Sequence, residues 1–375
     1  MKPVSRARYF IWVPLGAIAS LLIILFIALW RWSPGEPRLP TDLSGRPLSG
    51  GFAEKTFIPI GGVQQGMFIR GTRTSNPVLL FVHGGPAFPE YFLAEKFPAG
   101  LEEHFTVCYW EQRGGGMSYR DDTPPETMTL EQLASDALGV TDYLRGRFGK
   151  EKIYLMAHSG GSSFAIQAVA RAPGKFHAYI GMAQITRQAE SEKLAYEFIV
   201  DQYYHTGDED RLRELERYRP LNSVAGIEQF FMSPVRDRAM HALGVGTMHD
   251  MRSVVTDIFI PVWTSPAYTM KEKMNFWISR FSFIKKTTLP QQVLALDVPL
   301  RVPKLDIPVY LMSGRYDMTV NYQLAKNYLD SLQAPLKGFY TFENSAHSPL
   351  FEEPGRVKEI LVKDVLRGHN GLADK

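Results

Sequence analysis

Hydrophobic residues in the first half of the chain form short continuous runs that alternate with a long amphipathic segment. The runs are rich in β-branched and aromatic residues and lie at 56–60, 67–70, 78–82, 105–110 and 153–157. Between the last two, residues 130–148 carry Leu133, Ala137, Val140 and Leu144 at helical spacing. Near-continuous apolar strands that alternate with helices indicate an α/β fold with a mainly parallel sheet covered by helices on both faces.

The alternation of apolar strands and helices stops after residue 183 and resumes near residue 301. Residues 184–300 form charged, helical and aromatic segments without a strong buried strand, which predicts an inserted helical lid. Strand-like runs then reappear at 309–313 and 338–343, with helical patterns at 324–332 and 357–366. We therefore expect one core built from residues 52–183 and 301–368, with the lid between its two parts.

The N-terminal region predicts a membrane anchor. Residues 10–30 contain no charge over 21 positions, and a helix of that length matches a hydrocarbon core of about 30 Å. A cleaved signal peptide, with a shorter apolar region and a small-residue cleavage site, and a buried core helix are the alternatives. Residues 31–51, rich in Pro and Gly, are expected to form a linker.

The charge distribution predicts how the anchor is oriented. Three cations precede the apolar segment, Lys2, Arg6 and Arg8, and Arg31 follows it directly. This asymmetry favours a cytoplasmic segment 1–9 and a single-pass protein whose folded body lies outside the cytoplasm. The formal charge of the whole chain is +3, but these four cations account for the excess, so the nearly neutral remainder gives no electrostatic case for nucleic-acid binding.

A serine set among small residues is the first candidate for chemistry. In "AHSGG", Ser159 follows the strand at 153–157, and Ala157 and Gly161 stand two residues to either side. A nucleophile elbow requires this arrangement, because the serine sits on a sharp strand-to-helix turn that leaves little room for neighbouring side chains. The alternative is a helix start capped by Ser159.

A serine nucleophile needs a histidine base that is oriented by a carboxylate. Asp317 follows the strand at 309–313, and His347 follows the strand at 338–343. Of the nine histidines only His347 and His369 come after Asp317, and His369 lies in the polar C-terminal tail. The order Ser159, Asp317, His347 at successive strand ends therefore predicts a catalytic triad, although each residue alone has an ordinary structural explanation.

Backbone N–H groups are expected to stabilise the negative charge that develops on the substrate oxygen. The loop "HGGP" at 83–86 follows the strand at 78–82 and brings Gly85 forward as the first donor, with Gly84 as the alternative. Gly160 is the expected second donor. A simple Gly-Pro turn is the alternative for the loop. This mechanism needs no metal or other cofactor, and the single cysteine, Cys108, excludes an intrachain disulfide and a cysteine-based zinc cluster.

Together these motifs resemble the α/β-hydrolases of the proline iminopeptidase-like group, peptidase family S33. The resemblance rests on "HGGP", "EQRGGGMS" at 111–118, "AHSGGS" at 157–162, "GRYD" at 314–317 and "SAHSP" at 345–349. It implies an α/β-hydrolase fold and serine hydrolase activity. The sequence departs from the iminopeptidase pattern at Ala87, Glu111, Gly115 and Met117, so we expect no strict requirement for an N-terminal proline.

The expected function is cleavage of an ester or amide bond in a small molecule or short peptide. The alternatives are a proline iminopeptidase-type aminopeptidase and a non-catalytic binding module with the same fold. An aminopeptidase must neutralise the substrate ammonium, and the start of the lid offers four carboxylates, at Glu190, Glu192, Glu197 and Asp201. The alternative for these four is a solvated helix face paired with Arg187 and Lys193.

Overall fold

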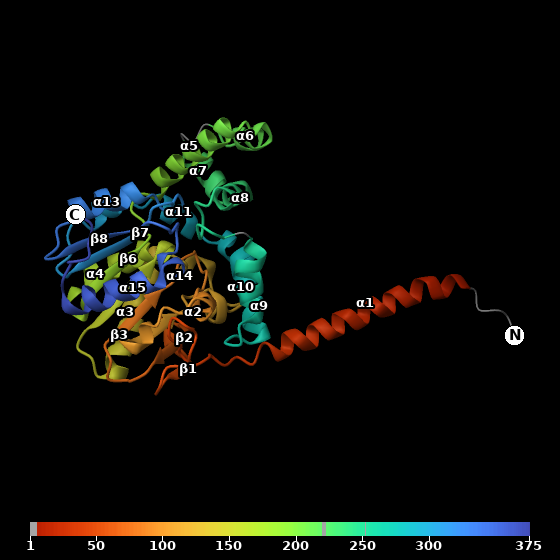
Figure 1. The fold of residues 1–375 in the computed structure, drawn as a ribbon, viewed down its shortest axis with the longest axis horizontal. Helices are drawn as coiled ribbons and strands as arrows, with labels where there is room; N and C mark the ends of the chain where they lie inside the picture. Colours follow the sequence, from red (N-terminus) through yellow and green to blue (C-terminus); the bar gives the residue numbers. More distant parts are fainter. Residues whose placement is uncertain (1–5, 220–222, 252) are drawn as a thin grey trace.

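The body of the protein is built on one eight-stranded sheet, shown by a computed structural model that describes residues 6–219, 223–251 and 253–375 (Figure 1). The strand order is β1-β2-β4-β3-β5-β6-β7-β8. The strands are β1 (Phe52–Ile60), β2 (Val63–Gly71), β3 (Val78–Val82), β4 (Thr106–Trp110), β5 (Ile153–His158), β6 (Phe176–Met182), β7 (Val309–Gly314) and β8 (Lys337–Phe342). Only the pairs β1/β2 and β2/β4 are antiparallel, which confirms the predicted mainly parallel sheet.

Helices cover both faces of the sheet, as the continuous apolar strands predicted. Leu80 and Val82 of β3 belong to one apolar cluster with helices α3 (Leu130–Phe148), α4 (Ser162–Arg171) and α13 (Tyr322–Ser331). Leu79 and Phe81, which alternate with them, belong to a second cluster with α2 (Tyr91–Lys96), α14 (Pro349–Glu352) and α15 (Pro354–Lys363). Adjacent residues of one strand thus pack into two cores on opposite faces of the sheet.

Strand β6 is the part of the core that the sequence analysis did not identify. Its sequence "FHAYIGM" includes Ala178 and Gly181, which have weak strand propensity, and the exposed His177. In the sheet β6 is nevertheless central, because it pairs in parallel with both β5 and β7. Burial between its neighbours outweighs its local propensity.

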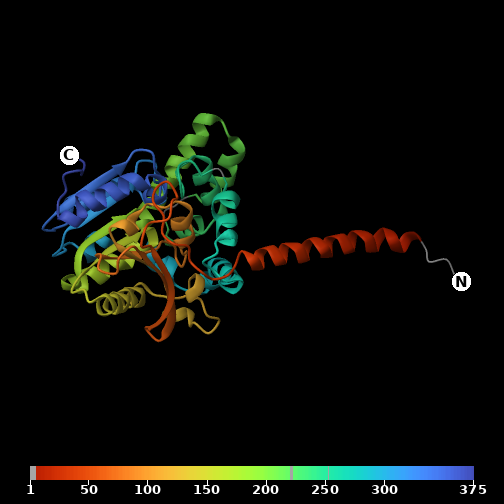
Figure 2. The same cartoon turned by 60° about the horizontal axis from the view of Figure 1, so that its bottom comes forward.

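Helical segments occupy the described chain between β6 and β7 and lie over one end of the sheet (Figures 1 and 2). They begin with α5 (Gln188–Thr206), α6 (Glu209–Glu216), α7 (Val224–Phe231) and α8 (Pro234–Ala242). A π-helical turn, η6 (Val255–Phe259), leads into α9 (Ile260–Thr264), and α10 (Met270–Ile278) leads into a second π-helical turn, η7 (Ser279–Phe283). The segment ends with η8 (Ile284–Lys286), α11 (Leu289–Leu294) and α12 (Val298–Arg301).

Helix α1 (Arg6–Arg31) leads away from the body in both views (Figures 1 and 2). The expected membrane span at 10–30 falls within α1, but the side chains of residues 10–16 lie outside the described part, as do residues 1–5 of the expected cytoplasmic segment. Among the described residues, no helix combines the length and hydrophobicity that crossing a membrane requires.

Candidate active site

The residues singled out by the sequence come together at the carboxyl edge of the parallel strands. Ser159 follows β5, Asp317 follows β7, and His347 lies in the loop after β8. The glycine loop at 83–86 follows β3, which lies directly beside β5. The carboxyl edge of a parallel sheet collects the loops after every strand, so four segments distant in sequence converge there.

Ser159 occupies a strained turn between β5 and α4. Its backbone φ is +50°, and only two other non-glycine residues of the described chain have a positive φ. The turn is packed against the glycine loop, because a Cβ atom added to Gly161 would lie 2.3 Å from the carbonyl oxygen of His83. The small residues of "AHSGG" are therefore required by close backbone contact, and the strain presents the serine hydroxyl at the tip of the strand.

The three triad candidates form one continuous hydrogen-bonded chain. His347 Nε2 lies 2.7 Å from Ser159 Oγ, and His347 Nδ1 lies 2.9 Å from Asp317 Oδ2. The second oxygen of Asp317 accepts hydrogen bonds from the backbone N–H groups of Thr319 and Val320, each at 2.9 Å. Asp317 is 1% exposed, so its orientation is fixed by buried contacts. This geometry holds the imidazole with Nδ1–H toward Asp317 and leaves Nε2 to accept the serine proton.

The glycine loop presents its backbone toward Ser159. Gly84 N–H already donates to Glu90 Oε1 at 3.2 Å, which leaves Gly85 as the preferred donor of this loop. Gly85 has φ +118°, a conformation open to glycine and strained for other residues. Gln112 holds the loop from behind, since its Nε2 donates to the carbonyl of His83 at 2.6 Å. Gly160, the expected second donor, is in close contact with Gly85.

A buried Glu90–His158 pair lies beneath the triad and was not identified from the sequence. His158 Nδ1 lies 2.8 Å from Glu90 Oε1, and His158 Nε2 lies 2.8 Å from the carbonyl oxygen of His347. Both ring nitrogens face acceptors, so both carry protons and His158 is an imidazolium. Burial opposes this charge, but Glu90 and the two hydrogen bonds outweigh it and raise the pKa of His158. Burial likewise opposes the Glu90 carboxylate, while His158 lowers the pKa of Glu90 overall.

This pair joins three parts of the site. Glu90 binds the glycine loop through Gly84 N–H, and His158 binds the backbone carbonyl of His347, the candidate base. The sequence signals were a glutamate six residues after Gly84 and a histidine directly before the elbow serine. Neither spacing indicates that these two side chains meet, because His158 ends β5 and Glu90 lies in the segment after β3.

A half-buried carboxylate, Glu352, fixes the loop that carries His347. Glu352 accepts hydrogen bonds from the backbone N–H groups of Ala346 and Ser348, at 3.1 and 3.0 Å, and from His249 N–H of the lid. Burial raises the pKa of Glu352 despite these donors. The residues on both sides of His347 are thus held in place by one side chain.

Glu111 connects the core to the lid. Tyr268 donates its hydroxyl proton to Glu111 Oε1 at 2.5 Å, and Met117 N–H donates to Oε2 at 2.7 Å. Burial raises the pKa of Glu111 to about 8, against the effect of these hydrogen bonds. Near neutral pH this carboxyl therefore holds a proton that most glutamates have lost.

The lid carboxylates named by the sequence analysis do not form one group. Glu192 is fully buried and binds Arg236 through both oxygens, each at 2.6 Å, so its charge is already neutralised within the lid. Glu190, Glu197 and Asp201 are exposed. The solvated-face alternative thus describes these three, although Arg187 forms its ion pair with Asp297.

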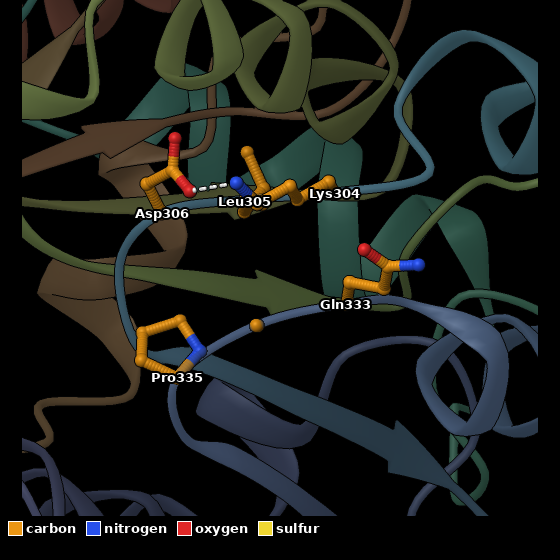
Figure 3. A pocket seen from close by; sticks show the side chains of 6 residues that line it. Lys304, Leu305, Asp306, Gln333 and Pro335 are labelled. Atoms are coloured by element: carbon orange, nitrogen blue, oxygen red, sulfur yellow. Dashed lines mark ion pairs between the residues drawn. The ribbon is translucent and has the colours of Figure 1, made fainter.

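A surface hollow of about 350 Å³ lies away from the triad (Figure 3). It is lined by residues 304–306 and 333–335, including an ion pair of 2.7 Å between Lys304 and Asp306. These residues precede β7 and β8, whereas Asp317 and His347 follow the same strands. The hollow is therefore at the opposite edge of the sheet and takes no part in the site.

Comparison with known proteins agrees with this architecture. Residues 77–354 match the alpha/beta hydrolase fold family. The chain is 30% identical over 315 residues to the Bacillus subtilis (strain 168) protein named "Probable aminopeptidase YbaC", covering 82% of this chain and 94% of that protein. It is 23% identical over 299 residues to a proline iminopeptidase of Saccharolobus solfataricus, covering 76% and 84% of the two chains.

A solved structure shows the same fold. The crystal structure of proline iminopeptidase from Mycobacterium smegmatis superposes with a TM-score of 0.60 at 16% identity, covering 84% of this chain and 98% of that one. The family match spans most of the sheet and includes the segments that carry Ser159, Asp317 and His347. The chain belongs to the α/β-hydrolase fold family.

Proposed function

We propose that this protein is a serine hydrolase that cleaves an ester or amide bond of a small molecule or short peptide. One observation carries the proposal: Ser159, His347 and Asp317 form a hydrogen-bonded chain with distances of 2.7 and 2.9 Å at a strained strand end. A serine with a purely structural role requires neither a strained turn nor a hydroxyl that points at a buried histidine. A nucleophile requires both features.

In the proposed reaction, Ser159 Oγ attacks the substrate carbonyl carbon while His347 Nε2 takes the serine proton. Asp317 stabilises the imidazolium that forms, and the N–H groups of Gly85 and Gly160 donate to the developing oxyanion. His347 then gives the proton to the leaving alcohol or amine. Water, activated by the same imidazole, attacks the acyl-enzyme and releases the acid.

The site favours a small substrate. Ser159 is only 9% exposed and His347 only 6% exposed, so the reacting groups lie below the surface. The aromatic ring of Phe88, which follows the glycine loop, lies 5.0 Å from Phe276 of lid helix α10. The burial of the reacting groups supports a small molecule or short peptide as the substrate.

Hydrolysis of a short-chain aryl ester by the full chain tests this proposal. We expect Ser159→Ala to leave only residual turnover, because the remaining groups have no nucleophile to activate. Ser75→Ala, at an exposed loop serine, is the matched control and should retain the wild-type rate. Equal turnover by wild type and Ser159→Ala would refute the assignment.

A second candidate is an aminopeptidase, supported by the 30% identity to a protein named "Probable aminopeptidase YbaC". The test compares an alanyl or prolyl arylamide that has a free amine with its N-acetylated form and with the aryl ester. Strong preference for the free amine favours the aminopeptidase, whereas equal or better ester turnover favours the ester hydrolase. Because Glu190 and Glu197 are exposed, we expect Glu190→Gln and Glu197→Gln to leave that preference unchanged.

We also propose that α1 anchors the hydrolase to a membrane, with the folded body outside the cytoplasm. The support is the uncharged segment at 10–30 and the excess of cations on its N-terminal side. A reporter fused to the C-terminus should be active only outside the cytoplasm. Release of a mature form beginning near Ser33 would instead identify a cleaved signal peptide.

A further inference from the structure

The lid carries a continuous exposed apolar surface, which we call the lid ridge. Its residues are 43–61% exposed and come from η6, the residue directly before it, α9, α10 and η7: Val254, Val255, Phe259, Ile260, Met274, Ile278 and Phe281. Half-buried Trp277 connects them, because its ring lies 5.2 Å from that of Phe259 and 5.8 Å from that of Phe281. A contiguous apolar patch of this kind on a folded protein marks an interaction surface.

The lid ridge is held firmly at the base of α1. Lys273 of α10 is fully buried, and its Nζ donates to the carbonyl of Trp32 at 2.8 Å and to Ser33 Oγ at 2.9 Å. The N–H groups of Gly35 and Glu36 both donate to the carbonyl of Pro266, between α9 and α10. Helix α1 therefore ends on the lid itself and not on a free linker.

A membrane plane perpendicular to α1 at its base would contain the lid ridge. In both views α9 and α10 run across the direction of α1 at its base (Figures 1 and 2). A bilayer that held α1 would meet the body along these helices. Trp30 and Trp32, 64% and 49% exposed, lie at the end of α1 beside the lid, where aromatic side chains favour the membrane interface.

The charges around the lid ridge suit an anionic lipid surface. Residues 253–286 contain five cations and two carboxylates. Both carboxylates form ion pairs with the core: Asp257 with Lys96 and Glu272 with Lys55. The exposed cations of this segment are Lys271, Lys285 and Lys286. Exposed lysines close to a bilayer are attracted to anionic lipid headgroups.

We propose that the lid ridge binds the surface of a lipid bilayer, so that the lid of the hydrolase rests on the membrane that α1 enters. This proposal rests on the proposed anchoring by α1. A second copy of the chain suits the surface less well, because two facing ridges would bring like-charged rims together. Apolar side chains would enter the interface while the lysines meet the headgroups, which is the arrangement of interfacial amphipathic helices.

Depth-dependent fluorescence quenching in the full chain tests the proposal. Cys108 is the single native cysteine and is fully buried, so an environment-sensitive NBD probe can be placed at one introduced cysteine at a time. The ridge variants are Val255→Cys and Phe281→Cys. Leu300→Cys, at a residue 79% exposed elsewhere on the lid, is the matched control, and Ile23→Cys reports on α1. The proteins are reconstituted in vesicles of phosphatidylcholine and phosphatidylglycerol, with or without doxyl-labelled lipid.

We expect blue-shifted emission and strong doxyl quenching at positions 255, 281 and 23, and neither effect at position 300. Quenching at 23 without quenching at 255 and 281 would overturn the ridge proposal and leave the anchor intact. Absence of quenching at all positions would overturn both. A blue shift at 255 and 281 without lipid quenching would identify an interface between two copies and would also overturn it. Fluorophosphonate labelling of each sample reports separately on the proposed hydrolase.

Discussion

The buried Glu90–His158 pair makes a pH-dependent contribution to stability that a single substitution exposes. Glu90→Gln keeps an acceptor for His158 Nδ1 and Gly84 N–H, but it removes the negative charge. A hydrogen bond to a charged group contributes about 1.5–3 kcal/mol and a neutral one about 0.5–1.5 kcal/mol. We therefore expect Glu90→Gln to lower the free energy of unfolding by about 1–2 kcal/mol at pH 6.

The sign of the pH dependence follows from the two pKa shifts. Folding raises the pKa of His158, so its contribution to the free energy of unfolding is fully present below its unfolded-state pKa of about 6.5. This contribution is lost as pH rises through the folded-state pKa. Folding lowers the pKa of Glu90, so its contribution to the free energy of unfolding is present above its unfolded-state pKa of about 4.5. This contribution is lost as pH falls through the folded-state pKa. The difference in the free energy of unfolding between wild type and Glu90→Gln should thus be largest between about pH 4.5 and pH 6.5 and should shrink at alkaline pH.

Urea unfolding of the detergent-solubilised full chain at a series of pH values measures this difference. Glu192→Gln is the matched control, because Glu192 is also a fully buried carboxylate but its partner, Arg236, stays protonated throughout this range. Its destabilisation should be constant from about pH 6 to pH 9. If the Glu90→Gln difference were equally constant, His158 would not be an imidazolium and the argument from its two acceptors would fail.

Three further predictions concern the site. Gly160→Ala should abolish ester turnover, because its Cβ would lie 2.0 Å from the carbonyl oxygen of Gly85, whereas Gly174→Ala, with no atom within 4 Å of the added Cβ, should match wild type in the same assay. Asp317→Asn should lower kcat by about 10⁴-fold, because the amide favours the wrong tautomer of His347; steady-state kinetics with a near-normal kcat would place the acid elsewhere. Burial raises the pKa of Glu111 to about 8, so its folded form holds a proton that the unfolded form loses above about 4.5. Stability should therefore fall as pH rises between these values in wild type and less so in Glu111→Gln, as measured by thermal unfolding.

The sequence was sufficient for the parts of the fold whose local signals agree with their environment. The continuous apolar run of β3 and the helical spacing of α3 each predicted the observed element. Strand β6 was missed, because Ala178 and Gly181 carry little strand propensity and its place in the sheet is set by burial between β5 and β7. Such a strand is determined by tertiary pairing, which no local pattern contains.

The same distinction applies to the site. Ser159, Asp317 and His347 were accessible from the sequence because each follows a recognisable strand in an order that one mechanism explains. Glu90 and His158 were not, because their contact depends on how the segment after β3 packs against the end of β5. The exposed positions of Glu190 and Glu197 were equally undetermined, since helical spacing relates residues to one another but not to the cleft.

Covalent labelling shows whether Ser159 is the activated nucleophile that the proposed function requires. The full chain is treated with a fluorophosphonate probe, and the modified residue is located by peptide mass spectrometry. We expect one adduct, on Ser159, that is absent in Ser159→Ala and forms far more slowly in His347→Ala, because a serine needs a positioned base to react with this probe. An unmodified wild-type protein, or an adduct on another serine, would refute the role proposed for Ser159.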